Sequence, residues 1–145
     1  MVNQPVPYGV NAAGSSNKNG IIFAEASRSD SADPDGLGAG IYVSKEIVND
    51  FARGVDVHVN TTTSGSGTLV VKLQKKDPAT DTWADLPGAV TATLNDPADV
   101  ILTVYPGIAE TANVSVSDHL CHSWRVHATV ATAAVTFAVG AVYLV

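Results

Sequence analysis

The sequence has little cysteine and little positive charge. Its single thiol, Cys121, excludes a disulfide within the chain. Charged residues make up only 15% of it, against roughly 25% in an average globular protein. Lys and Arg number 8 against 14 Asp and Glu, for a formal net charge of −6. Nucleic acids and anionic membranes attract clustered basic side chains, and the largest such cluster in this sequence is the pair at 75–76. We therefore expect no nucleic-acid and no membrane partner.

Long apolar runs and helical periodicity are scarce as well. The chain has no stretch of about 18 apolar residues, and its first residues lack the basic start and apolar run of a signal peptide. We therefore expect no membrane-spanning segment and no secretion signal. Residues 44–50, SKEIVND, are the one segment expected to form a helical turn. The length of 145 residues suits one domain. A domain of this size can bury a sufficient core without disulfides or a bound metal.

The sequence does contain a repeated alternation of apolar and polar residues. In one segment, for example, Val55, Val57 and Val59 alternate with Asp56 and His58. A period of two places successive side chains on opposite faces of a strand, so such a segment predicts a strand with one buried and one solvated face. The candidate strands are residues 20–26, 39–43, 52–60, 68–76, 99–106 and 123–130.

The last segment, residues 133–145, differs because it is apolar on both faces. Val135, Phe137 and Val139 fall on one face, whereas Val142 and Leu144 fall on the other. This pattern predicts a strand in the centre of a sheet, or one whose second face is covered by a partner.

Turn-forming residues separate these candidate strands. SGSG at 64–67 predicts a short hairpin between the strands on either side of it. DPATDT at 77–82 predicts another turn, because Pro78 presets the backbone dihedral and Asp77 can cap its own backbone. We interpret this Asp-rich stretch as a turn and not as a site of chemistry.

Short strands at short intervals predict an all-β fold. We expect an antiparallel β-sandwich that is jelly-roll-like, with an immunoglobulin-like sandwich as the alternative. Residues 20–145 should form this single domain. Residues 1–19, rich in Asn, Gly, Ser and Pro, should form an extended N-terminal arm.

Two groups of side chains have the chemistry of metal ligands. His119 and Cys121 would share one face of a strand, but a structural zinc site needs four ligands and no second pair is evident. Asp77, Asp81 and Asp85 offer oxygens, but the loop lacks the Gly and Glu of a dedicated calcium loop. We therefore predict no metal ligands and no cofactor.

Arrangements for catalysis are also missing from the sequence. There is no G-x-S-x-G motif. Cys121 and His122 are neighbours and would face opposite sides of a strand, so they cannot act as a dyad. Glu25, Glu46 and Glu110 lie in separate segments with nothing to bring them together. We predict no catalytic residues and expect that the protein is not an enzyme.

Residues 53–145 carry a pattern that resembles a known class of proteins. One strand ends in a Q-x-x-D turn, a W-x-D-L segment follows, and a later strand carries W-R-V. The residues concerned are Gln74, Asp77, Trp83, Asp85, Leu86, Trp124, Arg125 and Val126. In these features the chain resembles small virion structural proteins of tailed bacteriophages, in particular jelly-roll cement or decoration proteins of phage heads.

This resemblance implies a function without catalysis. The chain would bind the assembled phage head and stabilise the shell, with the major capsid protein and copies of itself, as a dimer or trimer, as partners. It would lie on the capsid exterior of the virion after synthesis in the host cytoplasm. We expect contacts at Val6, Pro7, Tyr8, Val142 and Leu144. A phage tail component and a virion-displayed carbohydrate-binding module are the alternatives.

Overall fold

The computed structural model describes residues 20–62, 65–95 and 97–145, and this part of the chain contains strands and no helix. It therefore holds no helix that is long and apolar enough to cross a membrane. The strands are β1 (Gly20–Arg28), β2 (Ile41–Val43), β3 (Ile47–Val48), β4 (Gly54–Thr61), β5 (Thr68–Asp77), β6 (Thr82–Val90), β7 (Ala98–Val104), β8 (Ser115–Val116), β9 (Ser123–Ala131) and β10 (Val135–Leu144).

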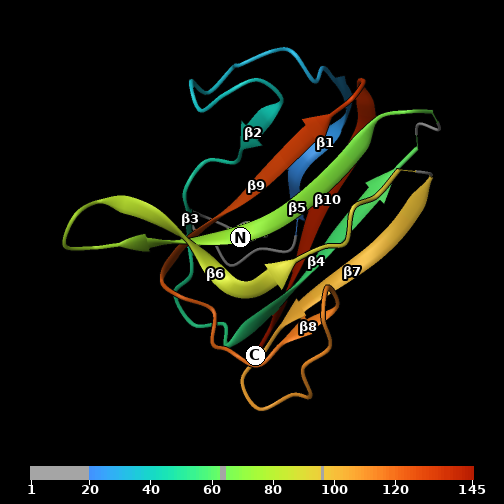
Figure 1. The fold of residues 1–145 in the computed structure, drawn as a ribbon. Helices are drawn as coiled ribbons and strands as arrows, with labels where there is room; N and C mark the ends of the chain where they lie inside the picture. Colours follow the sequence, from blue (N-terminus) through green and yellow to red (C-terminus); the bar gives the residue numbers. More distant parts are fainter. Residues whose placement is uncertain (1–19, 63–64, 96) are drawn as a thin grey trace, which may run out of the picture.

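These strands form two sheets that pack face to face (Figure 1). Sheet A has the order β1-β10-β4-β7-β8. Sheet B has the order β2-β9-β5-β6, and β3 also pairs with β9. Every pairing is antiparallel except the parallel pair of β7 and β8. The predicted all-β sandwich is confirmed.

The core lies between the sheets and follows from the alternation in the sequence. On β4, Val55, Val57 and Val59 are completely buried, while the polar residues between them are only partly buried. Trp124 on β9 and Phe137 on β10 are the largest completely buried side chains. Burial of such side chains is the main favourable contribution to folding. The alternation therefore determines which face of each strand meets the other sheet.

The apolar C-terminal segment is a central strand, as its pattern predicted. β10 lies between β1 and β4, so the first and last strands of the described chain are neighbours (β1 blue and β10 red in Figure 1). The two residues predicted to lie on its second face behave differently. Val142 is 38% exposed, whereas Leu144 is partly buried.

Two local predictions were wrong. Residues 44–50 form no helical turn, because Ile47–Val48 is strand β3 and pairs with Trp124 and Ser123 of β9. Pairing with the edge of β9 buries Ile47 against the core, and this outweighs local helix propensity. The strands on either side of 64–67 form no hairpin, because β4 belongs to sheet A and β5 to sheet B. The chain crosses between the sheets there, so that both strands bury an apolar face.

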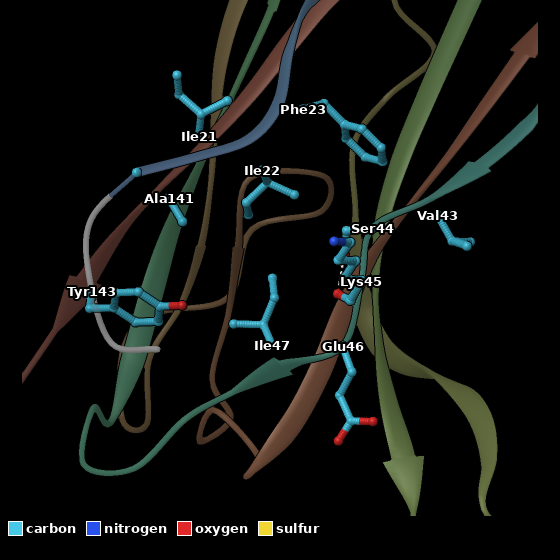
Figure 2. Close-up of a pocket in the computed structure, with 11 residues that line it drawn as sticks. Ile21, Ile22, Phe23, Val43, Ser44, Lys45, Glu46, Ile47, Ala141 and Tyr143 are labelled. Atoms are coloured by element: carbon cyan, nitrogen blue, oxygen red, sulfur yellow. Dashed lines mark hydrogen bonds between the residues drawn. The ribbon is translucent and has the colours of Figure 1, made fainter. Parts of the chain in front are cut away.

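The two long sides of the sandwich differ. On one side β6 bends toward sheet A, because four residues of β6 (86–89) oppose a single residue of β5 in the register. Leu86 and Ala89 are buried there, and Gly88 lies against Val116 of β8. The opposite side, between β1 and the segment of β2 and β3, is open and forms a groove (Figure 2).

Candidate interaction surface

The outer face of sheet A carries the surface on which the predicted contact residue Val142 lies. The register aligns Ile21 of β1, Gly140 of β10, His58 of β4 and Ile101 of β7 in one row across four strands. We call this surface the sheet A face; it consists of Ile21, Asp56, His58, Asn60, Asp99, Ile101, Thr103, Ala138, Gly140 and Val142.

Apolar side chains on the sheet A face are unusually accessible. Ile21 is 79% exposed, Ile101 45% and Val142 38%. Ala138 and Gly140 lie between them with almost no side chain, so the middle of the face is flat. Single exposed apolar residues are common, but several on one flat face are typical of a surface that binds another protein.

The sheet A face has few charges, and those charges are acidic. Strands β1, β4, β7 and β10 contain one Lys or Arg residue, Arg28. Its guanidinium lies 4.4 Å from the centre of the Phe137 ring and donates hydrogen bonds to backbone carbonyl oxygens, including that of Phe137 at 3.0 Å. Asp56 accepts a hydrogen bond from the Thr103 hydroxyl at 2.6 Å. A partner can cover such a face without desolvating many charged groups.

The outer face of sheet B is different, because its polar groups bind one another. Lys72 and Gln74 both donate to the carboxylate of Asp85, at 2.9 and 3.0 Å. The hydrogen bond from Gln74, followed by that from Lys72, lowers the pKa of Asp85. Arg125 donates to Gln74 at 2.8 Å and also lies 4.4 Å from the centre of the Trp83 ring. A network of this kind favours contact with water over burial under a protein.

His127 lies at the buried end of this network. Its side chain faces the outer side of sheet B, yet the residue is only 9% exposed, and its Nδ1 atom has no hydrogen-bond partner within the described part of the chain. Burial, and then the nearby charges of Lys72 and Arg125, lower the pKa of His127. The folded protein therefore holds this imidazole neutral at a pH where an unfolded chain begins to protonate it.

This histidine should make stability depend on pH. The folded-state pKa lies below the unfolded value of 6.5, so stability is full above about pH 7 and falls as the pH drops through 6.5 toward the folded pKa. One such group changes the free energy of unfolding by at most about 1.4 kcal/mol per pH unit. Urea unfolding between pH 7.5 and 5 should show a smaller loss for His127→Gln than for the wild type. Equal slopes would contradict this assignment.

The predicted contact residues Val6, Pro7 and Tyr8 lie outside the described residues. His119 and Cys121 do not lie on a strand with later residues, because β9 begins only at Ser123. This corrects the expectation that His119 and Cys121 share one face of a strand.

The candidate metal ligands do not form a cluster. His119 is exposed, with Nδ1 3.2 Å from the carboxylate of Asp118. The Cys121 thiol donates to the carbonyl of Ser123 at 3.4 Å, and burial raises its pKa. In the ranges that the structure describes, no three His, Cys, Asp or Glu side chains are placed to hold a metal ion.

The stretch around residues 77–82 is a turn, as predicted. The Asp77 carboxylate accepts hydrogen bonds from the Ala79 amide at 2.8 Å and the Thr80 hydroxyl at 2.9 Å. These two hydrogen bonds lower the pKa of Asp77. The carboxylate is thus used to hold the turn that connects β5 to β6.

Sequence reasoning missed Ile21 and Ile101 as members of the sheet A face. Ile101 follows the alternation of β7, since it lies between the buried-face positions Val100 and Leu102. The alternation therefore predicts that the Ile101 side chain is exposed. The alternation does not predict the position of Ile21, because the pairing of β1 with β10 shifts register between Ile21 and Phe23.

The chain matches no protein-family model, no curated protein and no solved structure.

Proposed function

We propose that the protein is a non-catalytic virion structural protein that binds the assembled phage head and stabilises its shell. The observation that carries this proposal is the sheet A face, which is flat, weakly charged and apolar at Ile21, Ile101 and Val142. The resemblance of residues 53–145 to phage virion proteins gives the face a partner, the major capsid protein.

A cement protein stabilises its shell by mass action. It binds the closed lattice and not the free subunits, so occupancy shifts the equilibrium toward the assembled state. Weak single contacts suffice when a dimer or trimer engages several lattice sites at once. The contrast between the two outer faces supports this arrangement. The sheet A face would meet the shell, while the hydrogen-bonded face of sheet B, which contains Asp85 and Arg125, would face the solvent outside the capsid.

The connectivity that we propose is that of a jelly roll. Strands β1-β10-β4-β7 of sheet A lie over β2-β9-β5-β6 of sheet B, and the first strand pairs with the last. In an immunoglobulin-like sandwich the first two strands belong to one sheet. Here β1 and β2 belong to different sheets. This order supports the arrangement of two interlocked Greek keys.

The test is the amount of this protein in separated heads and tails of virions that carry it. Quantitative mass spectrometry should find it in the head fraction in many copies. Its recovery only with tails would favour the alternative of a tail component. Its absence from both fractions would overturn the proposal of a virion protein altogether.

Binding to shells that lack the protein tests the sheet A face itself. Val142→Lys places an ammonium group on this face, next to Asp56 across the β10–β4 pair, so folding should be preserved. Burying that charge should weaken shell binding by about tenfold or more. The matched control is Val70→Lys on the outer face of sheet B, which should bind like the wild type. Equal loss in both variants would count against the sheet A face.

The carbohydrate-binding alternative gains no support from the aromatic residues. Sugar stacking needs accessible rings in a row, but Trp124 is 1% exposed and belongs to the core. Trp83 has the guanidinium of Arg125 and the ammonium of Lys76 over its ring, at 4.4 and 5.6 Å from the ring centre.

A further inference from the structure

The sheet A face carries two carboxylates, Asp56 on β4 and Asp99 on β7, and these two strands lie side by side (Figure 1). In the register Asp56 is opposite Thr103, which follows Asp99 and Ile101 on the same face of β7. The two carboxylates are therefore on the order of 13 Å apart along the strands. The exposed side chain of Ile101 lies between them. The apolar part of the face thus has an acidic group at either end of this row.

Neither carboxylate is neutralised by a basic side chain of the protein. Asp99 is exposed, and its carboxylate makes no hydrogen bond or ion pair with any residue in the described ranges. Asp56 accepts a hydrogen bond at 2.6 Å from the Thr103 hydroxyl, which carries no charge. Among the residues that make up the sheet A face, none is a Lys or Arg. The negative charge of this face is therefore open to a partner.

Several carboxylates on the side of sheet B are in the opposite situation. Asp85 binds the ammonium group of Lys72 at 2.9 Å. Glu46 and Asp81 both bind the ammonium group of Lys76, at 2.9 and 2.8 Å. These carboxylates have their counter-charges within the chain, whereas those of the sheet A face need one from outside if they are covered.

This need limits what can cover the sheet A face. A carboxylate that loses its water without gaining a counter-charge opposes binding. A basic side chain supplies both the charge and the hydrogen-bond donors, and such charge-assisted hydrogen bonds are roughly twice as strong as neutral ones. The carbon chain of a Lys or Arg can also pack on an apolar neighbour such as Ile101. The surface that fits is therefore apolar in its centre and basic opposite Asp56 and Asp99.

A second copy of the chain does not fit this description. Two sheet A faces placed against each other would bring carboxylates together with no Lys or Arg between them, in a chain whose formal net charge is −6. Like charges across an interface oppose association and exclude the wrong partner. Copies that assemble into a dimer or trimer would then use another surface.

We infer that the sheet A face binds a protein surface that presents basic side chains to Asp56 and Asp99 around an apolar centre. The apolar centre meets Ile101 and Val142, which are 45% and 38% exposed. This inference rests on the proposed function, because it specifies the chemistry of the shell surface that the face would meet.

Binding to shells that lack the protein, measured at increasing salt, tests the inference. The affinity of the wild type should fall by about tenfold between about 50 and about 500 mM sodium chloride, because salt screens the charge pairs. Asp99→Asn keeps the shape of the side chain and removes its charge. It should bind about tenfold more weakly at low salt and show a smaller salt dependence. The matched control is Asp81→Asn, which removes an exposed carboxylate from the turn between β5 and β6 and should bind like the wild type.

The outcomes separate this inference from the proposed function. If Val142→Lys weakens binding but Asp99→Asn binds like the wild type, the shell presents no basic side chain there, and the inference is wrong while the proposed function stands. Equal losses in Asp99→Asn and Asp81→Asn would show an effect of net charge alone and would also overturn it. If the wild type does not bind shells, the proposed function and the inference are both wrong.

Light scattering of the full-length chain provides a measurement without shells. Ile101→Lys changes the centre of the sheet A face, where the side chain is already exposed, so the variant should have the molar mass of the wild type in solution. Dissociation of an oligomer by this substitution would assign the face to a second copy and overturn the inference.

Discussion

Trp124→Ala should lower the free energy of unfolding by about 3–5 kcal/mol. Trp124 is 1% exposed, packs edge to face on Tyr143 at 6.2 Å, and lies on the central strand of sheet B. Its removal leaves a cavity that the rigid strands around it cannot fill. A domain of this size is stable by about 5–15 kcal/mol, so a large part of that margin would be lost. Urea denaturation at pH 7.5 measures the change directly.

Trp83→Ala is the matched control for this prediction. Trp83 is the second tryptophan of the chain, but it lies partly exposed near the start of β6. Its main interaction is with Arg125, 4.4 Å from the ring centre, which contributes about 0.5–1 kcal/mol at an exposed site. We expect a loss of about 1 kcal/mol. Comparable losses in the two variants would contradict the assignment of Trp124 to the core.

Gly40→Ala should lower the free energy of unfolding by about as much as Trp124→Ala. Gly40 has a φ of 77°, which an alanine adopts at a cost of about 1–2 kcal/mol. A Cβ atom there would also overlap the carbonyl oxygen of Val130. The backbone must then move and weaken the hydrogen bonds of Gly40 with Ala32 and Val130, both 2.8 Å. These terms add to about 3–5 kcal/mol, measured as a fall in the urea midpoint.

Gly36→Ala separates the two causes. Gly36 has nearly the same φ, 72°, but a Cβ atom there would meet nothing within 4 Å. Only the cost of the backbone conformation applies, so we expect a loss of about 1–2 kcal/mol. If Gly40→Ala is as stable as Gly36→Ala, the overlap with the Val130 carbonyl oxygen is relieved without loss of stability, and the prediction is wrong.

The sequence predicted the strands well wherever one face of a strand is buried. In β4, β5 and β9 the period of two and the burial agree residue by residue over most of each strand. Burial of one face determines this pattern, so it can be read without the partner strand. The turn at Asp77 was predictable for a different reason, because its hydrogen bonds are local.

Features that depend on distant partners could not be predicted. Asn49 is 7% exposed, and its side-chain amide donates to the carbonyls of Ala52 and Leu120 at 2.9 and 3.0 Å. Nothing in the local sequence distinguishes it from a surface asparagine. The same holds for β3, whose two residues form a strand only because the edge of β9 is available.

The candidate surface was predicted only in part. The apolar second face of residues 133–145 predicted Val142 as a contact residue. In the structure Val142 belongs to a larger surface that extends over four strands. The register between strands carries this information, and register depends on contacts between residues far apart in the chain. The expected contacts of Val6, Pro7 and Tyr8 stay a prediction, since these residues lie outside the described part.

The strand order has a consequence for how the fold forms. The last two strands of the described chain, β9 and β10, are central strands of the two sheets, and β1 and β4 are joined through β10. Neither sheet can therefore be completed before β9 and β10 have taken their places, and until then the earlier strands lack their neighbours. Pairing between residues so far apart in the sequence gives a high contact order and slow folding. Truncation of the C-terminal strand would thus prevent assembly of sheet A.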